Sequence, residues 1–308
     1  MEIALQFVLL ALGFVMLAKG ADWFVEGAAG IAMRFGIPQL VIGLTIVAMG
    51  TSAPEAAVSI AAAVKGNADI TIGNIVGSNI LNILVILGLA ASIVPIAVAR
   101  STVRIEIPFM IGVTALLFYQ GRDGSISLAD GGVLMVAFAA YMMYLYTMAM
   151  KSNVDSDLEE PGLPLGRCLL GAVGGLALII AGSNVTVGAA TSIATYAGLS
   201  ERFIGLTIVA LGTSLPELFT SVAAARRGNA DIAIGNIVGS NIFNILFVVG
   251  LSSLIIDIPF ASAFNFDTYV ALGAAVLLLL CVLRTQKLQR WAGALMLVCY
   301  AAYLGHIL

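Results

Sequence analysis

A segment of 40 residues occurs twice in this chain, and each copy carries one acidic residue inside an apolar stretch. Residues 43–55 read GLTIVAMGTSAPE, and residues 205–217 read GLTIVALGTSLPE. The correspondence continues to Asn82 and Asn244 at a constant offset of 162 residues, with 30 identities in the 40 positions. Glu55 and Glu217 are therefore equivalent. Because an ionisable residue is costly at membrane depth, a duplicated one indicates a functional site, here for cations.

The composition predicts an integral membrane protein. Of the 308 residues, 61% are apolar and 10% are charged, whereas soluble domains carry about 25% charged residues. A net charge of -3 without a basic cluster argues against a nucleic-acid partner. The first residues lack the positive charge of a secretory leader, so we expect the first helix to be retained. Cys168, Cys281 and Cys299 are far apart, which predicts packing roles and no disulfide.

The apolar runs are long enough for helices that cross a bilayer, which need about 20 residues each. They predict an all-α fold with ten transmembrane helices, at 3–34, 40–64, 70–93, 103–119, 128–150, 167–196, 202–225, 231–256, 267–284 and 290–307. Residues 151–166 form a polar linker between two five-helix repeats, 1–150 and 167–308. Because five is odd, the second repeat enters the membrane from the opposite side, which makes the repeats inverted.

The basic residues predict the orientation, since lysine and arginine favour the cytoplasmic side. With both termini outside, the outer segments hold only Lys65, Arg122 and Arg202. The inner segments then hold Arg34, Arg100, Arg104, Lys151, Arg167, Arg226, Arg227, Arg284, Lys287 and Arg290. We therefore expect a multi-pass protein of the cell membrane with a cytoplasmic linker. No protein partner is implied, which is compatible with a monomer in the lipid bilayer.

A proline directly before each acid predicts a broken helix. Pro54 has no N–H for the carbonyl of Gly50, and its ring displaces that carbonyl; Pro216 repeats the break in the second copy. Carbonyls of the preceding turn, including those of Thr51 and Thr213, become free to face an ion. Broken helices at mid-membrane supply such oxygens in transporters.

Oxygen donors dominate the repeated segment. Asn74, Ser78 and Asn82 are four residues apart and share one helix face, which the second copy repeats. The candidate ligands are the carboxylates of Glu55 and Glu217, the carbonyls of Thr51, Thr213, Ala48 and Ala210, the side chains of Ser78, Ser240, Asn82 and Asn244, and the flanking Ser52 and Ser214. Oxygen ligands suit hard cations such as Ca²⁺ and Na⁺. No cofactor is indicated.

The same carboxylates could serve either ion. Calcium takes about 6–8 oxygens, and two bidentate carboxylates with two threonine carbonyls would supply about six. Sodium ions could use the carboxylates with the serines and the alanine carbonyls, so that the two ions exclude each other. The alternative for the asparagines and serines is hydrogen bonding between helices. The alternative for the acids is a buried structural role, either protonated or paired with a basic residue, but no lysine or arginine at membrane depth offers such a pairing.

The motif G-x-T-x-x-A-x-G-T-S-x-P-E followed by G-N-x-x-G-S-N-I-x-N, present twice, resembles the α-repeats of the sodium/calcium exchanger family, within the cation/calcium exchanger superfamily. The resemblance covers nearly the whole chain and is similar to the compact prokaryotic members. It implies that Glu55 and Glu217 are central ligands, that Thr51 and Thr213 give calcium carbonyls, and that the helices at 3–34 and 167–196 slide across a fixed core. Some archaeal relatives carry aspartate where this chain has Asn244, so the number of sodium ions and any proton involvement stay open.

Other functions remain as alternatives. Protons or potassium could replace or join sodium, since superfamily members differ in this. A passive channel is disfavoured by the inverted repeat, and an intramembrane protease lacks short-spaced His or Cys ligands. Lys19, Asp22 and Glu26 share a helix face without symmetric counterparts, which predicts an interfacial ion pair. The duplicated Asp69 and Asp231 are expected to cap helix starts.

Overall fold

The computed structural model describes residues 2–66, 69–152, 164–198 and 210–307. The first repeat contains α1 (Glu2–Arg34), α2 (Gln39–Ile42), η1 (Gly43–Val47), α3 (Ala48–Thr51), α4 (Ala53–Val64), α5 (Asp69–Leu81), η2 (Asn82–Leu87), α6 (Gly88–Ile93), β1 (Ile96–Ala97), η3 (Thr102–Glu106), α7 (Ile107–Gln120), η4 (Gly121–Asp123), β2 (Ser125–Ile126) and α8 (Leu128–Ser152). These apolar segments form the helices expected from the sequence within a few residues.

The described part of the second repeat follows the same order of main helices and strands, without counterparts of η3 and η4. It contains α9 (Leu165–Tyr196), α11 (Ala210–Thr213), α12 (Leu215–Arg226), α13 (Ala230–Phe243), η6 (Asn244–Val249), α14 (Gly250–Ile255), β3 (Ile258–Pro259), α15 (Ala263–Val282), β4 (Lys287–Leu288) and α16 (Arg290–Ile307). The first part of the predicted helix 202–225 lies outside the described residues. Together the two repeats make an almost entirely helical protein.

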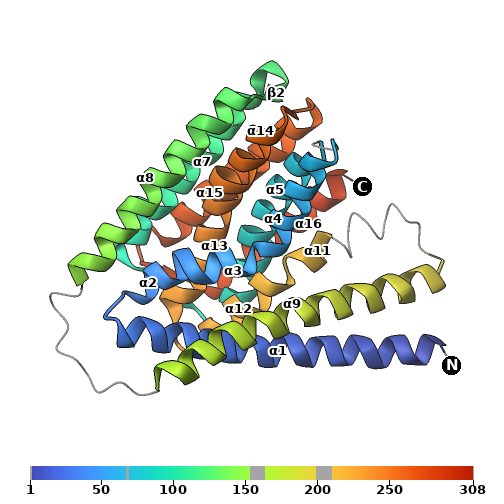
Figure 1. Cartoon of the computed structure of the whole chain (residues 1–308), viewed down its shortest axis with the longest axis vertical. Helices are drawn as coiled ribbons and strands as arrows, with labels where there is room; N and C mark the ends of the chain where they lie inside the picture. Colours follow the sequence, from blue (N-terminus) through green and yellow to red (C-terminus); the bar gives the residue numbers. More distant parts are fainter. Residues whose placement is uncertain (1, 67–68, 153–163, 199–209, 308) are drawn as a thin grey trace.

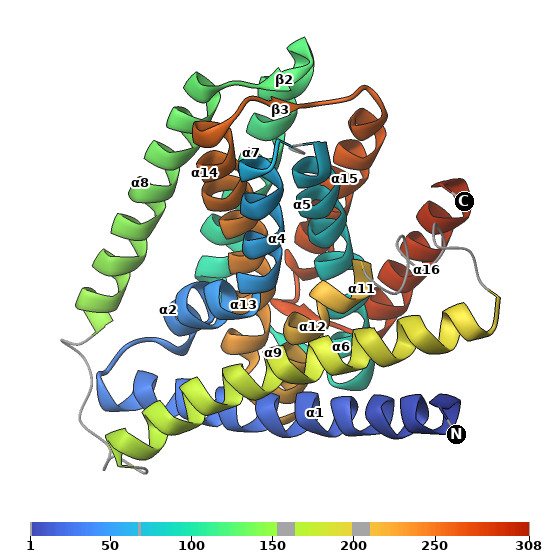
Figure 2. The same cartoon turned by 45° about the vertical axis from the view of Figure 1, so that its right-hand side comes forward.

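The two longest helices, α1 and α9, lie side by side across one end of the bundle (Figures 1 and 2). Glycines permit this close contact, since a Cβ added at Gly27 would lie 2.4 Å from the backbone nitrogen of Ala172. A Cβ added at Gly175 would lie 2.5 Å from the backbone nitrogen of Phe24. Helices such as α5, α7, α8 and α15 run steeply away from this pair (Figure 1), and α13 is buried in the interior.

Short strands tie the repeats together at both ends. β1 pairs with β4 through Ile96 and Leu288, and β2 pairs with β3 through Ile126 and Ile258. The two antiparallel pairs are equivalent under the offset of 162 residues, because β1 corresponds to β3 and β2 to β4. Two-residue strands leave no periodic pattern, so the sequence did not predict them.

The helix of residues 39–64 is broken, as the proline predicts. The segments Gln39–Thr51 and Ala53–Val64 bend by 51° at Ser52, whose backbone leaves the helical region with φ -81° and ψ 6°. Ser214 has nearly the same backbone, φ -90° and ψ 5°, before α12. Both repeats also contain a π-helical turn that begins at an equivalent asparagine, Asn82 in η2 and Asn244 in η6. Such turns are frequent at functional sites.

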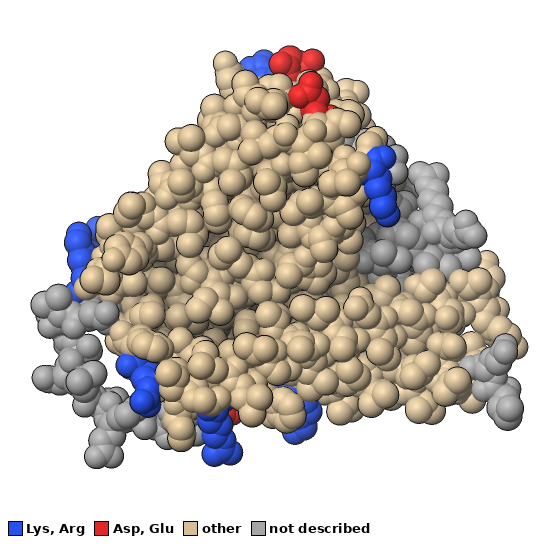
Figure 3. Space-filling view, in the orientation of Figure 1, with Lys and Arg blue, Asp and Glu red and all other residues tan. Residues whose placement is uncertain are grey.

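The described helices have the length and composition of membrane spans. Seven of them are long and apolar enough to cross a bilayer, and the bent pair makes an eighth. The predicted span 202–225 is only partly described, and α16 does not meet this criterion, so the count of ten stays a prediction. The face shown in Figure 3 is largely uncharged, with its charged residues at the outer edges. This is the pattern of a multi-pass membrane protein.

Several polar residues away from the repeat motif have structural roles. Asp22 and Glu26 form ion pairs, as predicted for this helix face, but their basic partner is Arg227 of the other repeat, at 3.3 and 3.1 Å. Asp231 lies at a helix start, as expected, in the first turn of α13; the N-cap position is Asn229, and no side-chain cap bond forms there. Within the described structure none of the three cysteines takes part in a disulfide. In each repeat a tyrosine also binds an acid on the neighbouring peripheral helix, Tyr144 to Glu106 and Tyr303 to Asp267.

Candidate cation site

Glu55 and Glu217 lie in the first turns of α4 and α12, directly after the two helix breaks. Each side chain is only 1% exposed, and the two carboxyl groups interact electrostatically. Neither forms an ion pair with a basic residue of the described chain. The positive end of each half-helix stabilises a carboxylate in its first turn. The structure thus brings together the two acids that the sequence singled out.

The two carboxylates are held by serines of the opposite repeats. Ser52 donates a hydrogen bond to Oε1 of Glu217 at 2.9 Å, and Ser214 donates one to Oε1 of Glu55 at 3.2 Å. All four side chains are buried. Because each serine sits at a helix break, its hydroxyl can reach across the pseudo-symmetry axis instead of bonding within its own helix. The carboxylates are therefore oriented reciprocally.

Four buried acceptor oxygens of the repeated segments have no hydrogen-bond partner in the described structure. They are Oε2 of Glu55, Oε2 of Glu217, Oδ1 of Asn82 and Oδ1 of Asn244. The turn η6 packs on α4, and η2 packs on α12, so each asparagine lies on an element that contacts an acid-bearing helix. A buried acceptor without a donor costs about 1–3 kcal/mol. A cation is the kind of ligand that satisfies acceptors alone.

This donor set is richer in neutral oxygens than in acids. Among the described residues no group of three or more His, Cys, Asp or Glu side chains could hold a metal ion. The two carboxylates are instead surrounded by hydroxyl, amide and main-chain oxygens. Such a set suits Na⁺ or Ca²⁺ better than a transition metal, which prefers nitrogen or sulfur.

Ala48, Thr51 and Ser240 meet beside the carboxylates. The hydroxyls of Thr51 and Ser240 each lie 3.3 Å from the carbonyl oxygen of Ala48, which also accepts the Ser52 amide at 3.0 Å. Thr51 Oγ1 lies 2.9 Å from Oδ1 of Asn236 as well. A hydrogen bond from Ser240 to the carbonyl of Ala48 thus connects two of the predicted ligands, one from each repeat.

The equivalent group in the second repeat is only partly described. Ser78 is buried and Thr213 is half-buried. Ala210 begins α11, but its side chain and the preceding residues 199–209 lie outside what the structure describes. Ser78 and Thr213 therefore lie on the expected elements, and the backbone of Ala210 does as well.

Asn74 and Asn236 serve helix packing, the alternative considered for them. Asn74 Nδ2 donates to the main-chain oxygen of Glu55 at 3.3 Å and to Ser59 Oγ at 2.9 Å. Asn236 makes the equivalent bonds to Glu217 and Ser221 at the same distances. They hold α5 and α13 against the half-helices that carry the acids. Their side chains support the site through the backbone of each acid.

A cavity of about 710 Å³ lies between α4, α9 and α11. Its walls include Pro54 and Thr213, next to the acids, and Ser183 and Asn184 on α9. Ser183 donates to the carbonyl of Gly212 at 2.7 Å and so connects α9 to the turn before the second break. Sequence reasoning missed Ser183, because its counterpart in the first repeat is Ala21.

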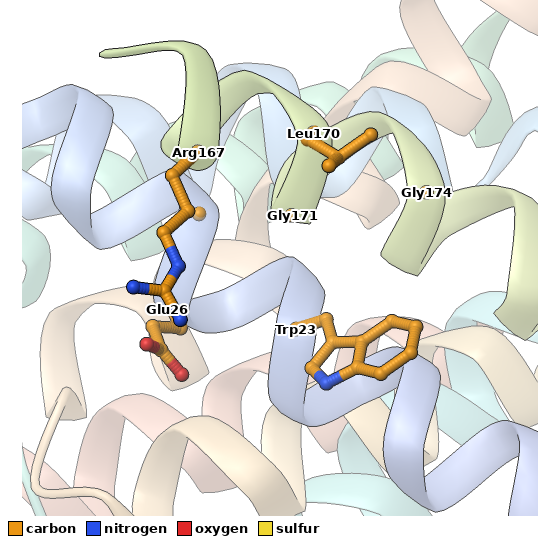
Figure 4. A pocket seen from close by; sticks show the side chains of 7 residues that line it. Trp23, Glu26, Arg167, Leu170, Gly171 and Gly174 are labelled. Atoms are coloured by element: carbon orange, nitrogen blue, oxygen red, sulfur yellow. The ribbon is translucent and has the colours of Figure 1, made fainter. Parts of the chain in front are cut away.

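A second cavity, of about 530 Å³, lies apart from the carboxylates between α1 and α9. Figure 4 shows Trp23 and Glu26 of α1 facing Arg167 and the glycines of α9 across it. Glu26 is already paired with Arg227. This cavity therefore does not coincide with the oxygen cluster, and it reflects the small side chains at the contact of α1 with α9.

The comparison with known families agrees with this arrangement. The sequence profile described as sodium/calcium exchanger protein matches residues 5–147 and 168–308. The chain belongs to the sodium/calcium exchanger family. This is a family of transporters and not of enzymes. The two matched stretches flank the predicted linker and include both acid-bearing segments.

Relatives match this family member over almost its whole length. The putative antiporter CaxA of Alkalimonas amylolytica is 41% identical over 98% of both chains. The sodium/calcium exchanger MaX1 of Methanosarcina acetivorans is 33% identical over 98% of both chains. A structure of the sodium-calcium exchanger NCX_Mj soaked with Na⁺ and Sr²⁺ superposes with a TM-score of 0.86, at 34% identity, and covers 98% of this chain and 99% of its own. The overall fold is therefore that of the exchanger.

Proposed function

We propose that this family member is a secondary antiporter that exchanges Ca²⁺ for Na⁺ across the membrane. The observation that carries the proposal is the pair of buried carboxylates at the two helix breaks, each with one oxygen bound by the other repeat's serine and one oxygen without a partner. The names of MaX1 and NCX_Mj as sodium/calcium exchangers support the same pair of ions.

The proposed ligands are those predicted from the repeated motif. Ca²⁺ binds the carboxylates of Glu55 and Glu217 with the carbonyls of Thr51 and Thr213. Na⁺ uses the same carboxylates with the oxygens of Ala48, Ala210, Ser78, Ser240, Asn82 and Asn244. In this arrangement Ser52 and Ser214 orient the carboxylates through their hydrogen bonds, which refines their role as candidate ligands.

Exchange follows because the two kinds of ion share the carboxylates. Two negative charges balance one divalent ion, and ionised carboxylates without a cation are costly to bury. A bound calcium ion therefore excludes sodium, and sodium excludes calcium. The cavity beside Pro54 and Thr213 offers an access route, and the glycine-lined contact of α1 with α9 fits helices that slide to open the site alternately.

The proposed topology keeps both termini outside and the linker at residues 151–166 in the cytoplasm. The ten predicted inner basic residues support it. A small epitope added after Leu308 should be accessible on intact cells, and an epitope inserted at 155–158 should require permeabilised cells. The opposite labelling would reverse the orientation without affecting the proposed ion site.

The function is tested by calcium flux in proteoliposomes that contain the purified protein. An imposed sodium gradient should drive uptake of radioactive calcium, and unlabelled Ca²⁺ inside should support exchange. Gradients of protons and of potassium, imposed separately at the same voltage, test the alternative coupling ions. Uptake driven by a pH gradient but not by a sodium gradient would replace sodium in the proposal.

A further inference from the structure

Four asparagines, two from each repeat, are joined by hydrogen bonds where α5 and α13 meet. Asn79 Nδ2 donates to the main-chain oxygen of Asn241 at 3.2 Å, and Asn241 Nδ2 donates to the main-chain oxygen of Asn79 at 3.1 Å. Asn82 Nδ2 donates to Oδ1 of Asn241 at 2.9 Å. Asn244 Nδ2 donates to Oδ1 of Asn79 at 3.2 Å. All four side chains are at most 3% exposed.

The polarity of this network follows from its two main-chain oxygens. A carbonyl oxygen only accepts hydrogen bonds, so Asn79 and Asn241 must direct their NH₂ groups toward it. Their own Oδ1 atoms then face Asn244 and Asn82 as acceptors. Asn82 and Asn244, the outer asparagines, must therefore present their NH₂ groups to these acceptors. The Oδ1 atoms of Asn82 and Asn244 then lie on the side away from the network.

Those two Oδ1 atoms are the buried oxygens of Asn82 and Asn244 that have no partner in the described structure. A network that served only helix packing would have no reason to leave an equivalent acceptor unsatisfied in each repeat, since such groups are costly. Both outer asparagines begin π-helical turns, η2 and η6, which pack against the acid-bearing helices α12 and α4. The unsatisfied ends therefore belong to the region of the carboxylates.

We propose that Asn79 and Asn241 are positioning residues, which orient the amides of Asn244 and Asn82 so that their oxygens and not their NH₂ groups face the transported cation. This inference rests on the proposed cation exchange. An amide that turned over would present partial positive charge to the ion. The hydrogen bonds between α5 and α13 thus determine which atom of each outer amide faces the ion, although Asn79 and Asn241 do not bind the ion themselves.

The test uses Asn79→Leu, which removes both the donor to the main chain and the acceptor for Asn244. The half-saturating Na⁺ concentration for calcium exchange should rise about tenfold, the loss expected for one directed ligand oxygen. Adding Asn244→Asp should restore much of the sodium affinity, because both oxygens of a carboxylate are acceptors and its orientation no longer matters.

Asn74→Leu is the matched control. It removes an asparagine hydrogen bond between helices on the same helix α5, but Asn74 does not contact Asn244. Adding Asn244→Asp should not restore any loss in this variant. Na⁺-induced thermal stabilisation of the purified protein gives a second readout that does not require transport.

Two results would overturn the inference. One is an Asn79→Leu protein with an unchanged sodium titration. The other is a loss that Asn244→Asp fails to restore, which would indicate a structural role only. If the wild-type protein itself shows no sodium-driven calcium flux, the proposed function fails instead, so the two failures are distinguishable.

The single variant Asn244→Asp provides a test that does not depend on the folding of Asn79→Leu. With Asn79 intact, one oxygen of the new carboxyl faces Oδ1 of Asn79, and two acceptors cannot bond without a proton. In ion-free buffer this variant should therefore unfold at a lower temperature than the wild type, because the bond to Asn79 is replaced by a contact between two acceptors. An unchanged unfolding temperature would contradict the assigned amide orientation.

Discussion

Replacing either central acid by glutamine should weaken Ca²⁺ binding far more than Na⁺ binding, and should therefore impair calcium transport. Glu55→Gln keeps the shape of the side chain and lets its amide oxygen accept the bond from Ser214, but it removes one of the two buried negative charges. Two unit charges about 4 Å apart interact by roughly 4 kcal/mol at the effective dielectric constant of about 20 that suits protein sites. The loss is therefore about 4 kcal/mol for Na⁺ and about 8 kcal/mol for Ca²⁺.

Part of each loss in binding free energy is offset, because a neutral glutamine costs less to bury than a charged glutamate. That offset is the same whichever ion binds, so it cancels when the two ions are compared. The remaining difference of about 4 kcal/mol corresponds to roughly three powers of ten in the ratio of calcium to sodium affinity. Glu217→Gln should behave equivalently, because Ser52 holds it in the same manner.

The measurement combines calcium flux in proteoliposomes with thermal unfolding of the purified variants at increasing Ca²⁺ or Na⁺. Stabilisation by calcium should disappear, and stabilisation by sodium should weaken. In ion-free buffer neither variant should unfold at a lower temperature than the wild type, since each loses one of two like charges. This separates loss of the site from loss of the fold.

Glu106→Gln is the matched control. Glu106 is also fully buried in the membrane region, but it binds Tyr144 on the peripheral helices and is not part of the central cluster. Its substitution should leave the ratio of calcium to sodium affinity unchanged. Normal calcium flux in either central variant, or an equal loss in Glu106→Gln, would refute the charge argument.

Three further predictions follow from contacts of the described residues. Asn244→Asp should alter the sodium titration more than the selectivity for calcium over strontium; an unchanged sodium curve would remove this residue from the site. Gly27→Ala should lower the free energy of unfolding by about 1–3 kcal/mol, because its Cβ would lie 2.4 Å from a backbone atom of α9. Gly174→Ala, with no described atom within 4 Å of the added Cβ, should be neutral. Equal effects of the two substitutions would contradict the packing of α1 on α9. Arg227→Gln should change the free energy of unfolding by less than about 1 kcal/mol, and less still at high salt, because its ion pairs are partly exposed; a larger loss in chemical denaturation would show that the tie to α1 is stronger than its exposure implies.

Much of the fold could be predicted because membrane helices leave a direct record in the sequence. The long apolar runs located the described helices within a few residues, and the prolines before each acid predicted the break that the structure shows at Ser52. The duplication predicted which residues are equivalent. These features depend on local composition or on a constant offset, so no tertiary information was needed.

The cross-repeat contacts could not be predicted in the same way. Ser52 is 165 residues away from Glu217 in the sequence, and nothing in the motif indicates that the two side chains meet. The structure pairs Ser52 with Glu217, because the non-helical backbone at the break turns the hydroxyl toward the other repeat. The pairing of β1 with β4 and the asparagine network likewise depend on how two distant segments meet.

The reciprocal pairing has a consequence for how the site responds to its ion. Each carboxylate has one oxygen fixed by the opposite repeat and one oxygen free, so neither repeat contains a complete site by itself. A cation bound to both free oxygens would therefore join the two half-helices directly. Its binding energy would depend on the relative position of the repeats, and by reciprocity that position would depend on the bound ion. Because Ca²⁺ and Na⁺ differ in charge and in the number of oxygens they bind, they would stabilise different relative positions. In the proposed exchanger, selection of the ion and movement of the helices therefore have the same physical origin.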